Sequence, residues 1–143
     1  AAMLTPQIER LPKIKKIHVE NWNLLHSLIH DHDNIEIPMP LPQVDSFCDT
    51  MQFHLTGLSR EKADQFIDLM KMEKVPMQIF GAKRNARDYR QWEYVEAHKE
   101  ELGETIANIE FACDLSLQPH LTQDNIRVIA QVIGEVLAYI NAQ

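Results

Sequence analysis

The sequence predicts a single α+β domain, residues 1–143, in which a small antiparallel sheet of about three strands packs with about four helices on one face. Three observations lead to this expectation. Apolar stripes at helical spacing alternate along the chain with short extended segments. No internal repeat or low-complexity linker interrupts them. A chain of 143 residues with 45% hydrophobic side chains is long enough to bury one core between a sheet and its helices.

The first predicted element is a long helix from Leu11 to about His32. Pro12 would lie in its first turn, where a missing N–H costs little. Because little chain precedes it to cover its far face, this helix is expected to project. The helical spacing is carried by Leu11, Ile14, Ile17, Leu24, Leu25, Leu28 and Ile29. A short extended piece at 35–37 follows and is stopped by Pro38, Pro40 and Pro42.

Two strands and a helix are predicted in the middle of the chain. The segment 46–55 is typical of a strand with one buried face, carried by Phe47, Met51, Phe53 and Leu55. Ser59 is a good N-cap for a helix that runs to about Glu73. Its apolar stripe consists of Ala63, Phe66, Ile67 and Met70. The second strand spans 75–80 and is closed by Gly81.

The last third of the chain predicts a loop, a helix, a strand and a final helix. A polar loop covers 82–99, and a helix covers 100–113 with the apolar residues Leu102, Ile106, Ile109 and Cys113. A short strand, 115–117, precedes Pro119. Thr122 then caps the last helix, whose stripe is Ile126, Ile129, Ile133, Val136, Leu137 and Ile140.

Composition excludes several classes of protein. No apolar run approaches the roughly 18 residues that span a bilayer, and no signal-peptide pattern opens the chain. Cys48 and Cys113 are too few for a disulfide framework, so we expect a reducing cytoplasm. A formal net charge of −7 argues against nucleic acid and acidic membrane surfaces as partners.

Two candidate chemical sites have weak support in the sequence. His26 and His30 stand four apart and share a helix face near Asp33, a spacing that can bind zinc. No third ligand or general base accompanies them, so a solvated polar face is the favoured interpretation and no metal is expected. Cys48 lacks a partner histidine at a telling position and is expected to be a small buried residue of a strand. The sequence identifies no catalytic residue.

A basic and aromatic loop is the most informative candidate. Tyr89 and Trp92 are interleaved with the cations Lys83, Arg84, Arg87 and Arg90. Arginine offers a planar fork to oxyanions and the aromatic rings offer stacking faces, so such a loop can grip phosphates or RNA. The alternative is a solvated loop with Tyr89 or Trp92 anchored in the core. The overall acidity argues against RNA.

Residues 75–95 (VPMQIFGAKRNARDYRQWEYV) resemble the strand and the substrate-side loop in the small domain of the DegT/DnrJ/EryC1/StrS aminotransferases. The segment 59–73 is similar to the helix before that strand. Residues 115–126 (LSLQPHLTQDNI) resemble the family's late strand, its proline and the L-T-x-x-x-I opening of its last helix. The helix 11–32 resembles the one that leads from the large domain into the small one. The resemblance covers nearly the whole chain in the family's order.

This resemblance implies a fold and a function. The fold would be the small-domain part of the aspartate-aminotransferase-like fold, with residues 1–33 as the connecting helix. Family members use pyridoxal phosphate (PLP) and an amino donor, usually glutamate, to aminate a keto-sugar, often a nucleotide sugar. The resemblance also implies a homodimer. The corresponding loop approaches the active site, which makes the candidate substrate contacts Gln78, Phe80, Lys83, Asn85 and Arg87.

The loop departs from the common family pattern. Where the family usually has a His-Tyr-Pro-like run, this chain has Gln78 through Lys83. The form F-G-A-K-x-N-A-R is similar to a branch that acts on an eight-carbon acidic sugar of the Kdo type, in cell-surface polysaccharide biosynthesis. Positive charge in the loop would suit a carboxylated or phosphorylated substrate.

The resemblance places the PLP-binding lysine, its acidic partner and the phosphate cup in the large domain, so this chain is expected to bind no cofactor alone and to be inactive alone. Two hypotheses follow. The chain is a domain of an aminotransferase, active only when joined to its large PLP-binding domain. Alternatively, it is a free-standing, non-catalytic domain that binds a ligand or a protein partner. An exposed apolar face on the first helix would fit either.

Overall fold

The computed structural model describes residues 5–82, 85–94 and 102–143. These contain four α-helices: α1 (Thr5–Ile29), α2 (Arg60–Met72), α3 (Gly103–Ile109) and α4 (Gln123–Asn141). The strands are β1 (Ile35–Glu36), β2 (Thr50–Leu55), β3 (Met77–Ile79) and β4 (Ala112–Ser116), and a 3₁₀ turn, η1, covers Tyr89–Gln91. The predicted α+β class is confirmed.

The strands form one antiparallel sheet in the order β1-β2-β4-β3. The sheet has four strands, where the sequence predicts about three, because the short extended piece after α1 pairs with the end of β2 through Ile35 and Leu55. Strand β4 is one of the two inner strands: its Cys113 is paired with Phe53 of β2 on one side and with Ile79 of β3 on the other. One face of the sheet is therefore a continuous apolar surface.

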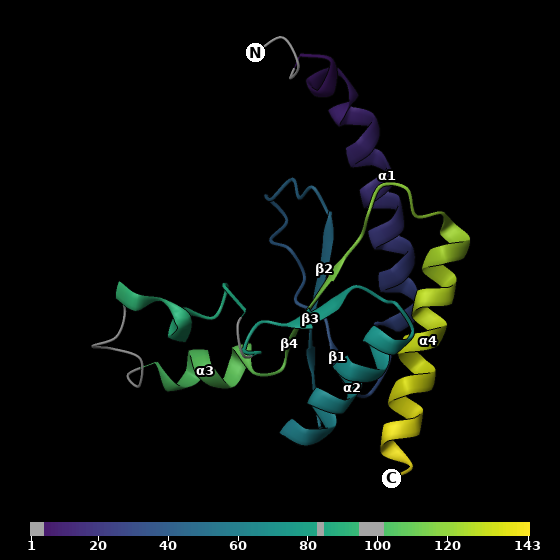
Figure 1. The fold of residues 1–143 in the computed structure, drawn as a ribbon. Helices are drawn as coiled ribbons and strands as arrows, with labels where there is room; N and C mark the ends of the chain where they lie inside the picture. The colour runs from purple at the N-terminus through teal and green to yellow at the C-terminus, as the bar shows by residue number, and fades with distance from the viewer. Residues whose placement is uncertain (1–4, 83–84, 95–101) are drawn as a thin grey trace.

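Helices α1, α2 and α4 cover that apolar face (Figure 1). The buried core consists of their inward stripes and the alternate strand residues, including Leu25, Met51, Phe53, Phe66, Met70, Ile79, Leu115, Ile126, Ile133 and Leu137. The caps predicted for two of these helices are present. Ser59 accepts a hydrogen bond from the backbone N–H of Lys62, and Thr122 forms a capping box with Asn125.

The segment between β3 and β4, which we call the β3–β4 connection, extends away from these helices (Figure 1). Its described parts are residues 80–82, 85–94 and 102–111, and they include η1 and α3. No residue of α3 is buried. Because α1, α2 and α4 all lie on the apolar face, none of these three helices covers the second face of the sheet.

Several predicted boundaries are wrong, including the start of the late strand, which is Ala112 and not Leu115. The helix predicted over 100–113 ends at Ile109, and Cys113 belongs to β4, because strand pairing with Phe53 and Ile79 outweighs the local helical spacing. The strand predicted from Ser46 begins at Thr50, and Phe47 lies outside it with its ring 5.3 Å from that of His18. The first helix begins at Thr5 and continues through Pro12.

The two cysteines have different environments. Cys48, predicted as a buried strand residue, precedes β2 with a φ of 59° and is partly exposed. Cys113 is fully buried at the centre of the sheet. Burial raises the pKa of the Cys113 thiol far above its usual range, and the negative charge of Asp114 raises it further.

We therefore expect a thiol reagent to modify Cys48 rapidly in the native protein and Cys113 only when the chain unfolds. Labelling of Cys113 should be slower by about a thousandfold or more, since native domains are stable by about 5 kcal/mol at least. Mass spectrometry of peptides after timed alkylation measures both rates. Equal rates would show that β4 is not protected in the core.

The first helix projects from the body of the molecule, and Ile8 and Leu11 are exposed on it (Figure 1). Among the described residues, no helix is both long and apolar enough to cross a membrane.

Candidate functional site

The second face of the sheet carries a row of polar side chains across three strands. The register places Gln52 of β2 beside Asp114 of β4, and Asp114 beside Gln78 of β3. Because side chains alternate along a strand, these three residues point away from the core that their neighbours Met51, Cys113 and Ile79 enter. We call this row the polar row.

Asp114 is the centre of the polar row. It is only 4% exposed. Its Oδ2 accepts a hydrogen bond from Nε2 of Gln78 at 3.3 Å. The same oxygen forms an ion pair with Nη1 of Arg87. Its Oδ1 is buried and has no hydrogen-bond partner among the described residues. A buried carboxylate needs a partner charge, and Arg87 supplies it.

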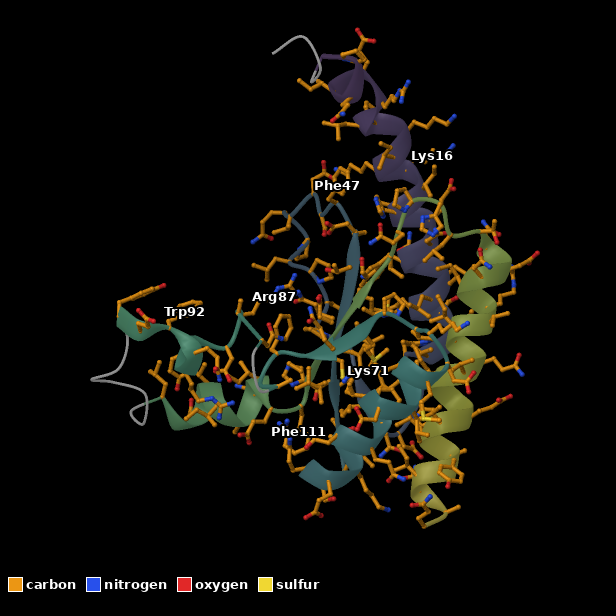
Figure 2. All side chains as sticks on the ribbon, in the orientation of Figure 1. Lys16, Phe47, Lys71, Arg87, Trp92 and Phe111 are labelled. Carbon is orange, nitrogen blue, oxygen red and sulfur yellow. The ribbon has the colours of Figure 1, made fainter. Side chains whose placement is uncertain are left out.

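Arg87 reaches the polar row from the β3–β4 connection. Its guanidinium carbon lies 5.4 Å from the centre of the Phe80 ring, so the cation rests on an aromatic face as well as on Asp114. Half of the Arg87 side chain is exposed. Figure 2 shows Arg87 on the side of the sheet opposite to α4. The remaining N–H groups of the guanidinium can therefore meet an anion from solvent.

The structure thus brings three of the five predicted site residues together: Gln78, Phe80 and Arg87. Asn85 has a structural contact instead, since its Nδ2 donates to the carbonyl of Ile79 at 2.8 Å and its Oδ1 accepts from the N–H of Arg87 at 3.0 Å. It fixes the backbone from which Arg87 extends. Lys83 lies outside the described residues.

Sequence reasoning missed Asp114. The available signal was an acidic residue between Cys113 and Leu115, two apolar residues of a strand. An ionisable group in that position is rarely buried without a partner. The partner, Arg87, could not be identified without the fold.

A second ionic cluster anchors the β3–β4 connection to the sheet. Asp88 is buried and accepts from Nε and Nη2 of Arg90, at 3.0 and 2.9 Å. Nη1 of Arg90 donates to Glu110 at 3.1 Å, just before β4. A Cβ at Gly81 would lie 3.0 Å from the carbonyl of Ile109, so the close approach of the chain after β3 to the end of α3 favours glycine.

Burial acts to raise the pKa of Asp88, but the hydrogen bonds and charge of Arg90 outweigh it, and the pKa of this carboxyl lies below its usual value. Arg90 is therefore committed to an internal ion pair and is not a free phosphate ligand. Tyr89 is buried, as one of the two interpretations of the loop expected, whereas Trp92 is partly exposed and stacks on Tyr94. Arg84 lies outside the described residues.

Trp22 and His26 of α1 form a stack of rings with His30, which follows the end of the helix. The rings of Trp22, His26 and His30 follow one another at 5.1 Å. Burial lowers the pKa of His26, and the nearby His30 lowers it further. Within 5–82, 85–94 and 102–143, no group of three or more potential ligands could hold a metal ion.

Three of the described lysines form polar contacts within the domain. Lys15 pairs with Asp45, Lys62 donates to the carbonyl of Ile140, and Lys71 pairs with Asp68 on the same helix. The contacts of these three lysines are structural, and no step through PLP is assigned to them.

Solved structures share this fold. The chain is similar to 3-amino-5-hydroxybenzoic acid synthase (TM-score 0.74, 21% identity), covering 93% of this chain and 36% of that one. It is similar to a protein described as a sugar aminotransferase, Spr1654 from Streptococcus pneumoniae, with a TM-score of 0.80 and 14% identity. That match covers 95% of this chain and 34% of that one. It is also similar to the aminotransferase TlmJ from Streptoalloteichus hindustanus, with a TM-score of 0.78 and 15% identity. That match covers 96% of this chain and 35% of that one. The chain spans about a third of the length of these proteins and has the fold of an aminotransferase domain.

The family follows from the sequence comparison. The family model of the DegT/DnrJ/EryC1/StrS aminotransferases matches residues 1–133. The chain belongs to this aminotransferase family. No curated protein sequence matches it.

Proposed function

We propose that this chain is the C-terminal domain of a cytoplasmic PLP-dependent aminotransferase that transfers an amino group from glutamate to a keto-sugar. The observation that carries the proposal is family membership over residues 1–133. The chain works together with a large PLP-binding domain of the same enzyme, in a homodimer. It supplies substrate contacts and no catalytic residue.

The exposed guanidinium of Arg87 supports a substrate that carries an anion. One edge of Arg87 is held by Asp114 and its plane rests on Phe80, so its orientation is fixed while half of its surface remains open. A fixed arginine fork binds carboxylate or phosphate oxygens in two-point geometry. The amide of Gln78 lies beside it and can bond to a sugar hydroxyl.

Two anionic substrates fit this site. One is a keto-sugar acid of the Kdo type, in which Arg87 binds the carboxylate. The other is a nucleotide sugar, in which Arg87 binds a phosphate. Both belong to the biosynthesis of cell-surface polysaccharides. The conversion replaces a ketone by an amine, while glutamate becomes 2-oxoglutarate.

The native protein tests the proposal. An antibody against this domain should capture a polypeptide several tens of kilodaltons larger than the 16.6 kDa chain. Given isotopically labelled glutamate, the captured protein should transfer the label to a keto-sugar acid or to a nucleotide-linked keto-sugar, as detected by mass spectrometry. A polypeptide of the chain's own size that transfers no label would contradict the aminotransferase assignment.

The 143-residue chain serves as the control. Incubated with PLP and then with borohydride, it should acquire no reduced adduct on lysine, because the proposal assigns the cofactor lysine to the large domain. A single stable adduct on one lysine would overturn the assignment of cofactor binding to another domain.

A further inference from the structure

The second face of the sheet is polar from β2 to β3. Thr50 and Gln52 of β2 lie opposite Ser116 and Asp114 of β4, and Gln78 of β3 lies on the other side of Asp114. Their neighbours in each strand enter the core, so these side chains point away from it. Hydroxyl and amide groups therefore extend across the sheet beside the central carboxylate. The anion site proposed above occupies only one part of this surface.

A recess of about 220 Å³ lies at the β2 end of this surface. Strand β1 pairs with β2 only as far as Glu36, and the recess lies beyond that pairing. Gln52 lines the recess and also belongs to the polar row, so the recess and the row are continuous. The other lining residues come from β2, from the chain between β1 and β2, and from α1: Thr50, Ser46, Pro38, Pro40 and Trp22.

The polar groups of the recess are available to a ligand. Among the described residues, the side chains of Thr50 and Gln52 form no hydrogen bond. The hydroxyl of Ser46 accepts one backbone N–H, at 3.4 Å, and its own proton is still available to an acceptor. Trp22 adds an apolar surface, and its ring is stacked on that of His26 at 5.1 Å. Hydroxyls and an amide beside an aromatic ring suit a sugar, whose hydroxyl groups need partners and whose C–H groups pack on apolar surface.

The centre of the polar row is an incomplete hydrogen-bond network. Asp114 lies between Gln52 and Gln78, and its buried Oδ1 has no partner among the described residues. Native structures rarely leave a buried acceptor unpaired, and a group from outside the chain commonly completes such a network. A ligand hydroxyl that crosses the row would supply the missing donor.

We propose that the recess binds the hydroxylated end of an anionic sugar whose carboxylate or phosphate binds Arg87. The proposal rests on the function proposed above and extends its site across the sheet. The guanidinium of Arg87 lies on Asp114, one strand spacing of about 4.8 Å separates Asp114 from Gln52, and the recess continues beyond Gln52. With carbon–carbon bonds of about 1.5 Å, glycerate bound to Arg87 ends short of the recess, whereas a sugar acid of about eight carbons reaches it. The recess therefore favours long anionic sugars over short hydroxy acids.

Nuclear magnetic resonance of the isotopically labelled 143-residue chain tests the recess, because both ends of the proposed site belong to that chain. Titration with Kdo should shift the side-chain amide signals of Gln78 and Gln52 and the indole N–H signal of Trp22. Glycerate should shift the Gln78 signal and leave the Trp22 signal in place. UDP-glucose tests the second source of the anion: tighter binding than Kdo, with the same shifts at Gln52 and Trp22, would support the proposal with a phosphate on Arg87.

Two substitutions in the recess separate its contribution from that of Arg87. Thr50→Val and Gln52→Met should each weaken Kdo binding by about 3- to 10-fold, the usual effect of losing one neutral hydrogen bond. Both variants should bind glycerate as the wild type does, which also shows that they are folded. Gln131→Met, at an exposed glutamine of α4, is the matched control and should leave Kdo binding unchanged.

Two results would overturn the proposal. In one, neither Kdo nor UDP-glucose shifts the signals of Gln52 and Trp22. In the other, Thr50→Val and Gln52→Met bind these sugars as tightly as the wild type does. Binding is measured without turnover, so a native protein that transfers no label from glutamate would contradict the proposed function and leave the recess standing. Label transfer by the native enzyme without recess signals in the chain would retain the aminotransferase and remove only the recess.

Discussion

Replacing Arg90 by methionine is expected to lower the free energy of unfolding by about 3 kcal/mol at neutral pH. The substitution keeps an apolar stem but leaves the buried carboxylate of Asp88 without its partner charge. Breaking a buried ion pair from one side typically costs about 3 to 5 kcal/mol. We expect the lower end, since a quarter of the Arg90 side chain is exposed. Urea denaturation followed by circular dichroism measures the loss.

The loss should depend on pH with a definite sign. In the native protein the pKa of Asp88 is lowered, so its ionised form contributes stability above the unfolded pKa of about 3.9 and loses it as the pH falls through the lower folded value. In the variant the guanidinium no longer offsets burial, so the pKa of Asp88 should be higher than in the native protein, although the backbone N–H of residue 90 still donates to its carboxylate. The difference in stability between the two proteins should therefore be largest at neutral pH and shrink in acid.

Lys71→Met is the matched control for this experiment. Lys71 forms an exposed pair with Asp68 three residues away on α2, and such pairs contribute roughly 0 to 1 kcal/mol. If Arg90→Met costs no more than this control, the Asp88–Arg90–Glu110 cluster does not hold the β3–β4 connection on the sheet. Hydrogen exchange at the amides of Gly81 and Trp92 would then show where the connection opens.

Replacing Arg87 by methionine in the native enzyme is expected to lower kcat/KM for an acidic keto-sugar by about 10- to 100-fold. A hydrogen bond to a charged group contributes about 1.5 to 3 kcal/mol, which corresponds to that range. The loss should be mainly in KM if Arg87 binds the anion equally in the ground and transition states. Steady-state kinetics with the sugar acid and with its neutral methyl ester separates charge recognition from general damage.

The ester should be processed by the wild type and the Arg87→Met variant at similar rates, because it offers no carboxylate to the guanidinium. Lys71→Met, which removes an exposed cation from α2, should leave both substrates unaffected. An equal loss on acid and ester would mean that Arg87 supports the polar row through Asp114 and does not bind the substrate anion.

The sequence by itself determined the helical layer of this protein. The caps at Ser59 and Thr122 and the apolar stripes of α2 and α4 were predicted correctly, because capping and helical periodicity depend on residues within a few positions of one another. The order of motifs also predicted the aminotransferase family. Gln78, Phe80 and Arg87 are among the five candidate contacts that the family resemblance named, because the resemblance covers their loop and the strand before it.

Only the tertiary structure decided the sheet and the centre of the site. Cys113 follows the spacing of the preceding helix, yet it pairs with Phe53 and Ile79, which are distant in sequence. Asp114 meets Gln78 across 36 positions and Arg87 across 27. Strand register and the pairing of buried charges depend on which distant segments lie side by side in the fold. The local sequence around each residue does not determine that arrangement.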